Sequence, residues 1–159
     1  MDYTNNLFVF SEINKLVRLY FLCSSLLVLK IMLLIVFTIC TRMKTKAFIS
    51  QEDADFFGGE VVINDRVERI RRAVQNDLEN TLPFIIISYF YIYTNPPAWL
   101  VYILFLVFLV VRYLHGIVYA VIVVHQPTRA ILWAIGFIIT GFMALSIALF
   151  GLKGLMQST

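Results

Sequence analysis

Residues 65–93 read DRVERIRRAVQNDLENTLPFIIISYFYIY. The first half, as far as Asn80, is a charged helical pattern, and the second half, from Thr81, is almost wholly apolar. The two halves together predict one long helix over residues 66–93, which begins among polar groups and ends in lipid. Pro83 lies inside this helix, and helices in a membrane tolerate proline. The turn Asn95-Pro96-Pro97 follows it.

Three further apolar segments, about 13–41, 98–124 and 129–152, flank this one. Of the 159 residues, 60% are hydrophobic and only 14% are charged, whereas soluble domains have about 45–50% and 25%. The bilayer is therefore the expected solvent. A spanning helix needs roughly 20 apolar residues. We predict an all-α integral membrane protein, with four transmembrane helices in a single domain over 1–159 and one sizeable polar loop over about 43–65.

The N-terminal residues do not resemble a secretory signal, because Asp2 and Glu12 precede or interrupt the basic leader that such signals have. Basic residues then set the orientation. The first loop and its flanks are rich in Lys and Arg, the third loop carries Arg129, and the second loop has neither residue. We expect the first and third loops in the cytosol and both termini on the other side.

Four charged residues lie at one depth in the predicted bundle, counted from the cytosolic ends of their helices: Lys30, Asp77, Glu79 and Arg112. At 1.5 Å per residue this depth is roughly 18 Å. Charges in the membrane persist when they face the bundle interior, pair with each other or have a function. We therefore predict that these two cations and two acids pair inside the bundle.

Polar residues nearer the cytosol form two helical faces. The second helix has Arg72, Asn76 and Glu79 at i, i+4 and i+7, and the third has Arg112, His115 and Tyr119 at i, i+3 and i+7. Arg129 lies at the start of the fourth. Together they predict a pocket open to the cytosol, for a small water-soluble ligand with carboxylates and an amine, beside an apolar wall that faces lipid.

Each of these residues, taken alone, has a structural explanation. Arg72 could reach toward lipid head groups, His115 could be a packed and hydrogen-bonded side chain, and Tyr119 could be an interfacial anchor. The joint pattern favours a functional site. We expect no metal, because the two histidines are ten residues apart and no Cys/His cluster accompanies them. We also expect no nucleic-acid partner, because no basic patch has interleaved aromatics.

At these residues the sequence resembles the membrane-associated eicosanoid and glutathione (MAPEG) family. The most specific stretch is RVERIRRAVQNDLENTLPF at 66–84. The run Lys46-Ala47-Phe48, the segment 52–54, the Arg112/His115/Tyr119 face and the segment QPTRA at 126–130 also fit. The resemblance covers nearly the whole chain.

The resemblance implies a homotrimer of four-helix subunits in the endoplasmic reticulum membrane, or also in the outer mitochondrial membrane. Glutathione would be the co-substrate, bound between neighbouring subunits near the cytosolic face. Its other partners would be the bilayer and a lipophilic electrophile or lipid hydroperoxide. Carried over position by position, the residues expected to bind glutathione are Arg42, Arg72, Asn76, Glu79, Arg112, His115, Tyr119 and Arg129. Lys30 lies in the same region. Arg129 is the expected catalytic residue, beside the sulfur, although the sequence pattern alone does not choose it over Arg112.

The implied activity is that of a microsomal glutathione S-transferase, an enzyme that conjugates the glutathione thiolate to lipophilic electrophiles, with peroxide reduction by the same thiolate. One alternative is a glutathione-dependent prostaglandin E synthase, and another is a non-catalytic, lipid-presenting protein of the same fold. The departures Val74, Gln75, Ala130 and Trp133 favour the transferase over the synthase. The presence of Arg129 together with Arg72, Asn76 and Glu79 argues against the non-catalytic protein. A channel is disfavoured because the lumenal halves of the second and third helices are apolar.

Overall fold

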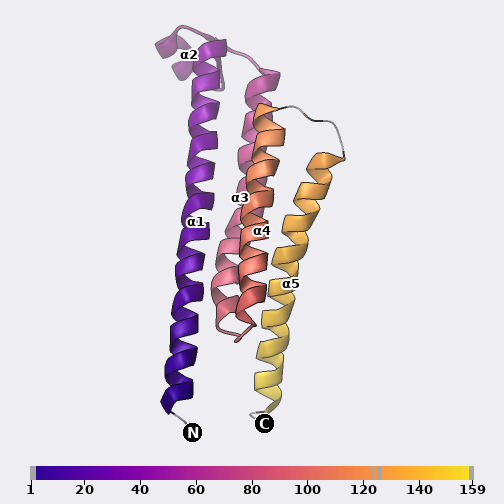
Figure 1. Cartoon of the computed structure of the whole chain (residues 1–159). Helices are drawn as coiled ribbons and strands as arrows, with labels where there is room; N and C mark the ends of the chain where they lie inside the picture. The colour runs from indigo at the N-terminus through magenta and orange to yellow at the C-terminus, as the bar shows by residue number, and fades with distance from the viewer. Residues whose placement is uncertain (1–2, 123, 125–126, 158–159) are drawn as a thin grey trace.

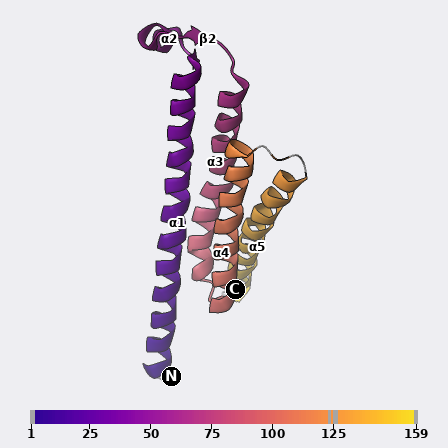
Figure 2. The same ribbon diagram turned by 45° about the horizontal axis from the view of Figure 1, so that its top comes forward.

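The four long helices of the described chain lie side by side (Figures 1 and 2). The computed structural model describes residues 3–122, 124 and 127–157, with side chains from residue 13 onward. The helices are α1 (Tyr3–Thr45), α3 (Asp65–Ile92), α4 (Ala98–Gly116) and α5 (Thr128–Gln157). A π-helical turn, η1 (Ile117–Val121), continues α4. Helix α1 contacts α3 and α4, and α5 contacts the same two helices, so α3 and α4 separate α1 from α5.

The helices differ from the predicted ranges mainly at their ends. Helix α1 continues to Thr45 rather than residue 41, and α5 continues to Gln157 rather than 152. The third predicted helix does not reach residue 124, because η1 ends at Val121 and Ile122 has an extended backbone. The helix predicted over 66–93 is α3, displaced by one residue at each end.

The segment between α1 and α3 is a small ordered structure rather than an open loop. It contains β1 (Ala47–Phe48), the short helix α2 (Gln51–Phe57) and β2 (Glu60–Val61), and the two strands pair in parallel. Gly59 makes the pairing possible, because a Cβ atom there would lie 2.5 Å from the Lys46 carbonyl oxygen. This structure lies at the opposite end of the molecule from both termini (Figure 1).

Side-chain oxygens of Ser50 and Asn64 cap the N-termini of α2 and α3. The Ser50 hydroxyl accepts a hydrogen bond from the backbone N–H of Asp53, which caps α2. The Asn64 side chain accepts hydrogen bonds from the backbone N–H groups of Arg66 and Val67, at 3.0 and 3.3 Å. These N–H groups have no partner within their own helix, so the caps fix where α2 and α3 begin.

Three helices in the described part of the chain are long and apolar enough to cross a membrane: Ile13–Thr45, Ala98–Val121 and Thr128–Gln157. Large apolar side chains are exposed along all of them, as expected for surfaces that contact lipid. The protein is therefore an all-α, multi-pass membrane protein. Helix α3 does not meet the same criterion because its first half is charged, and four spans remain a proposal.

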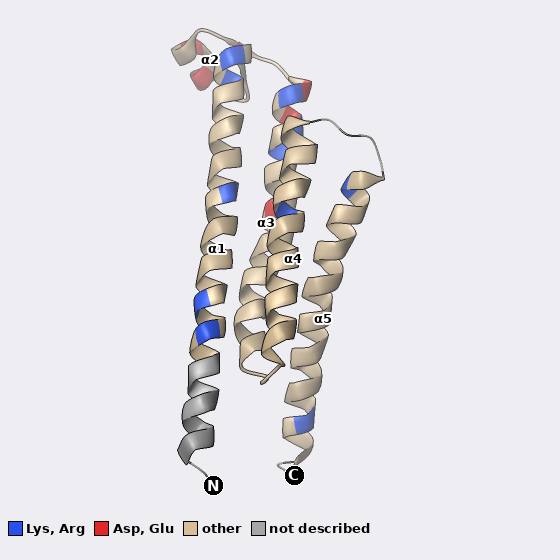
Figure 3. Cartoon of the chain, viewed as in Figure 1, with Lys and Arg blue, Asp and Glu red and all other residues tan. Residues whose placement is uncertain are grey.

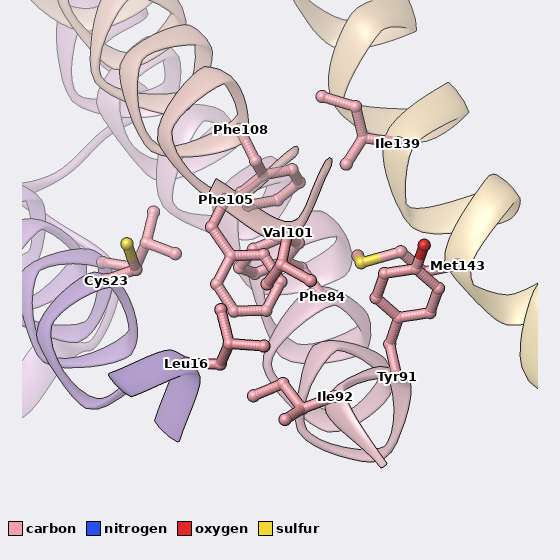
Figure 4. Packing of buried hydrophobic residues seen from close by; sticks show 11 residues of the cluster. Leu16, Cys23, Phe84, Tyr91, Ile92, Val101, Phe105, Phe108, Ile139 and Met143 are labelled. Atoms are coloured by element: carbon pink, nitrogen blue, oxygen red, sulfur yellow. The ribbon is translucent and has the colours of Figure 1, made fainter. Parts of the chain in front are cut away.

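Two apolar clusters hold the helices together. The larger lies toward the termini, where Phe84 of α3 stacks on Phe108 of α4 with ring centroids 3.7 Å apart. Figure 4 shows these rings between α1, which contributes Leu16 and Cys23, and α5, which contributes Ile139 and Met143. The smaller cluster lies toward α2 and is formed by Leu34, Ile70, Ala73 and Ala120.

Candidate functional site

Three charged residues lie in the interval between these two clusters: Lys30 of α1, Asp77 of α3 and Arg112 of α4. The Lys30 Nζ atom is 2.6 Å from Asp77 Oδ2, and Arg112 Nη2 donates to Asp77 Oδ1. All three are buried, with exposed fractions of 6%, 0% and 0%. We call this group the buried ion triad. Most of the remaining charged residues lie toward the two ends of the helices (Figure 3).

The spacing of buried residues explains why these three side chains meet. Positions 23, 27, 30 and 34 of α1 are buried, as are 73, 77, 80 and 84 of α3 and 101, 105, 108 and 112 of α4. Steps of three and four residues keep one face of each helix turned inward. Lys30, Asp77 and Arg112 each belong to the inward stripe of their own helix, so the packing of the helices brings the three charges together.

The predicted charge layer is thus confirmed for Lys30, Asp77 and Arg112, and it is wrong for Glu79. Asp77 pairs with both cations. Glu79 is exposed two residues further along α3, where its carboxylate accepts a hydrogen bond from Gln75 at 3.2 Å. Two residues turn a helix by about 200°, so Asp77 and Glu79 cannot face the same neighbours.

Asn76 connects the triad to an open cavity. Arg112 Nη2 donates to the Asn76 side-chain oxygen at 3.0 Å and to its backbone carbonyl at 3.3 Å. Asn76 also lines a cavity of about 420 Å³. The other lining residues are His115, Tyr119, Arg129, Ala130 and Trp133. The volume falls within the range of about 300–1,000 Å³ that is usual for small-molecule sites.

Two aromatic rings and one guanidinium define the wall of this cavity. The Arg129 guanidinium carbon lies 5.0 Å from the centroid of the Tyr119 ring, and that ring lies 5.6 Å from the ring of His115. A guanidinium at this distance from an aromatic ring is held by attraction to its π-electrons. The π-helical turn places Tyr119, and the first turn of α5 places Arg129. The arrangement fixes a positive charge at the edge of the cavity.

Several polar side chains around the cavity have nitrogen atoms that make no hydrogen bond within the described structure. Among the described residues, no partner is found for four buried nitrogen atoms: Arg112 Nε, Arg112 Nη1, His115 Nδ1 and Arg129 Nε. Buried polar groups are usually hydrogen-bonded to protein or water, so such a concentration points to a site for a polar ligand. Because the triad has two cations and one anion, its net charge is positive, which favours an anionic ligand.

The predicted site residues are divided among several surfaces of the single chain. Asn76, His115, Tyr119 and Arg129 share the cavity, and Arg112 lies behind Asn76. Arg72 is exposed on α3. Glu79 lines a separate hollow of about 240 Å³ between α3 and α5. Arg42 is half-buried on α1, and its Nε has no hydrogen-bond partner among the described residues. Binding of glutathione by any of these residues remains a prediction.

Two parts of the site were missed by the reading of the sequence. Asp77 was placed in the charged layer but not among the site residues, although it holds Arg112. The periodicity of α3 indicates this role, because Asp77 lies four residues after Ala73 and seven before Phe84, on the inward side of the helix. Trp133 was noted only as a departure from the family, yet it lines the cavity one helical turn after Arg129.

No group of three or more His, Cys, Asp or Glu side chains suited to a metal ion occurs within the described ranges. The site therefore consists of arginine, imidazole, phenol and amide groups. Set between helices of a multi-pass bundle, it defines the protein as a membrane protein with a polar cavity beside the lipid phase.

The comparison with known families agrees with this description. Residues 20–149 match the model of the MAPEG family, and the chain belongs to that family.

Relatives with two different names are similar to the chain. Prostaglandin E synthase from Bos taurus is 35% identical over 130 residues, which cover 80% of this chain and 84% of the relative. The Homo sapiens protein of the same name is 34% identical, with coverages of 80% and 85%. Microsomal glutathione S-transferase 1 from Homo sapiens is 35% identical over 127 residues, with coverages of 76% and 81%. The sequence identities to these relatives are too close to tell which of the two named proteins the chain resembles more.

Proposed function

We propose that this protein is a glutathione S-transferase, which joins the sulfur of glutathione to lipophilic electrophiles taken from the membrane. The observation that carries the proposal is the cavity lined by Asn76, His115, Tyr119 and Arg129, with buried nitrogens around it that have no partner among the described residues. A tripeptide with two carboxylates, an amine and a thiol matches such a set of donors. Relatives of both names support membership in an enzyme family.

Arg129 is the proposed catalytic residue. A free thiol has a reference pKa near 8.5, so only a small fraction of glutathione is thiolate at neutral pH. A guanidinium beside the sulfur stabilises the anion and increases that fraction. The Tyr119 ring holds the Arg129 guanidinium at the cavity edge, and the buried Nε of Arg129 has no partner within the described chain. A guanidinium held in place loses little mobility when the thiolate forms.

The chemical step is a nucleophilic substitution or addition. The thiol proton leaves to water, and the thiolate sulfur forms a bond to an electrophilic carbon. The leaving group departs with its bonding electron pair, or, in an unsaturated carbonyl compound, the displaced electrons take up a proton from water. In peroxide reduction, the thiolate attacks the terminal peroxide oxygen, the O–O bond breaks, and the alkoxide leaves and takes up a proton from water to become the alcohol. The sulfur is then a sulfenic acid, and a second glutathione thiol displaces its oxygen as water to give the disulfide.

Arg42, Arg72, Glu79 and Arg112 are the proposed remaining contacts to glutathione. Arg72 would pair with a carboxylate and Glu79 with the amine. Both are exposed on α3, the helix that contributes Asn76 to the cavity. A second copy of the chain would cover them, which is consistent with a homotrimer whose sites lie between subunits. We propose four spans with the cavity facing the cytosol, in the endoplasmic reticulum and also the outer mitochondrial membrane.

A second candidate function is the synthesis of prostaglandin E by isomerisation, also with glutathione. The observation in its favour is the 35% identity to the Bos taurus prostaglandin E synthase over 84% of that relative. Measuring the formation of prostaglandin E from its isomeric precursor, with and without glutathione, tests this candidate directly.

The proposed function is tested with purified protein in detergent. The measurement is conjugation of glutathione to 1-chloro-2,4-dinitrobenzene, together with glutathione binding by calorimetry. We expect Arg129→Ala to reduce the turnover number about 100-fold, the usual effect of removing one group that stabilises a developing anion. Arg18→Ala is the matched control, because Arg18 is exposed on α1 far along the chain from the cavity residues. Failure of the unmodified protein to bind glutathione defeats the proposal, whereas full activity of Arg129→Ala defeats only the role of Arg129.

A further inference from the structure

Lys30 makes two contacts in the buried ion triad. Its Nζ atom lies 2.6 Å from Asp77 Oδ2, and it also donates a hydrogen bond of 2.5 Å to the backbone carbonyl of Arg112. Lys30 therefore touches both other members of the triad. It does not line the cavity, whose described lining comes from α3, α4, η1 and α5. Lys30 can therefore influence a bound ligand only through its neighbours or through its charge, and not by contact.

Arg112 uses only part of its hydrogen-bonding capacity. One nitrogen, Nη2, makes all three side-chain contacts: to Asp77 Oδ1, to the Asn76 side-chain oxygen and to the Asn76 carbonyl. Nε and Nη1 are buried and have no partner in the described part of the protein. An arginine next to a carboxylate usually binds both of its oxygens through two parallel hydrogen bonds. Here Lys30 occupies the second oxygen of Asp77, so that pairing is blocked.

Removal of Lys30 would change the partner of Arg112. With Oδ2 of Asp77 vacated, the guanidinium could bind both carboxylate oxygens. It would then turn away from Asn76, the residue through which Arg112 reaches the cavity. The net charge of the triad would also fall from positive to neutral. Both effects weaken a site that holds an anionic ligand.

Gly116 provides the space that Lys30 needs. A Cβ atom at position 116 would lie 2.7 Å from the Lys30 Cε atom and 3.1 Å from Nζ. The first distance is far inside van der Waals contact, so a larger residue at 116 would displace the lysine head. Gly116 is the last residue of α4, one turn beyond the Arg112 carbonyl to which Lys30 donates. A larger residue at 116 would therefore move the end of the lysine side chain away from its present position beside that carbonyl.

We propose that Lys30 is a positioning residue, for which Gly116 provides the space. By occupying the second oxygen of Asp77, Lys30 prevents Arg112 from binding both carboxylate oxygens. Arg112 therefore keeps its hydrogen bond to Asn76, which lines the cavity for the ligand. The inference rests on the proposed function, since the ligand concerned is glutathione. It assigns to Lys30 and Gly116 a role in ligand affinity, although neither residue lines the cavity. A buried ion pair that served stability alone would leave the affinity of the folded protein unchanged.

The first experiment measures the dissociation constant of glutathione in detergent for Lys30→Leu and for Lys30→Leu/Asp77→Asn. Leucine fills the space of the lysine stem without its charge. We expect Lys30→Leu to weaken binding about tenfold, the effect of losing one good hydrogen bond. The double variant should regain most of the affinity, because asparagine cannot form the two-oxygen ion pair and the net charge of the triad is again positive.

The second experiment uses Gly116→Ala, a smaller change that preserves all charges. We expect weaker glutathione binding in the otherwise unmodified protein and no further weakening in the Lys30→Leu background, where the Lys30 Cε and Nζ atoms are absent. Gly154→Ala is the matched control, since a Cβ atom there meets nothing within 4 Å in the described structure. If Lys30→Leu is too unstable to purify, the Gly116→Ala affinity decides the question.

The outcomes separate the inference from the proposed function. Absence of glutathione binding by the unmodified protein overturns the proposed function, and this inference with it. If the unmodified protein binds, equal affinity in folded Lys30→Leu overturns the inference alone. So does equal affinity of Gly116→Ala, or failure of Asp77→Asn to restore binding to Lys30→Leu.

Discussion

Replacement of Asp77 by leucine should be among the most damaging single substitutions in this protein. Asp77 is completely buried and is the one acid paired with Lys30 and Arg112 in the described structure. Loss of one partner of a buried ion pair costs about 3–5 kcal/mol, because the other charge stays in a medium of low polarity. Here two cations lose the same partner and repel each other, so we expect a loss at or above the upper figure.

The assay is unfolding in mixed detergent micelles, followed by circular dichroism as the denaturing detergent is increased. The matched control is Asp53→Leu on α2, where the side chain is exposed. A second control replaces all three members of the triad by leucine. Apolar replacement of a whole buried ion network is often neutral or stabilising, so this variant should be more stable than Asp77→Leu. A loss below about 1 kcal/mol in Asp77→Leu, the size of an exposed ion pair, would refute the reasoning.

Three other substitutions test the packing and the loop. Phe84→Ala removes a completely buried ring stacked on Phe108, and we expect a loss of about 3–5 kcal/mol in the same unfolding assay. Asn64→Ala removes the cap of α3 and should cost about 1 kcal/mol, detected as a lower unfolding midpoint with unchanged helix content. Gly59→Ala places a Cβ atom against the Lys46 carbonyl, so we expect faster proteolytic cleavage between α1 and α3; an unchanged rate would contradict the close approach.

The sequence predicts the helices well because their signals are strong and local. The apolar segments are long, and Asn95-Pro96-Pro97 separates two of them without ambiguity. The interior of the first loop could not be predicted in the same way. Its two-residue strands depend on a hydrogen bond from the backbone N–H of Glu60 to the Lys46 carbonyl, fourteen positions apart, and the charged residues around them indicate only an exposed segment.

The depth of the candidate site residues in the bundle could be predicted from the sequence, but the direction in which their side chains point could not. Counting residues from the helix ends brings Lys30, Asp77 and Arg112 to one level, as the structure does. The same count also included Glu79, because depth alone does not tell which face of α3 turns inward. That choice depends on the packing of Phe84 and Ala73, which fixes Asp77 inside and leaves Glu79 outside.

The π-helical turn η1 makes the number of residues between His115 and Tyr119 a determinant of the geometry of the site. The hydrogen-bonded turn of a π-helix contains one more residue than that of an α-helix, and Tyr119 lies within η1. Deletion of Ile117 or Val118 would bring Tyr119 one position closer to His115 and turn its ring by about 100° around the helix axis. The ring would then leave the side of the helix that it shares with His115, and Arg129 would lose the aromatic surface against which it lies.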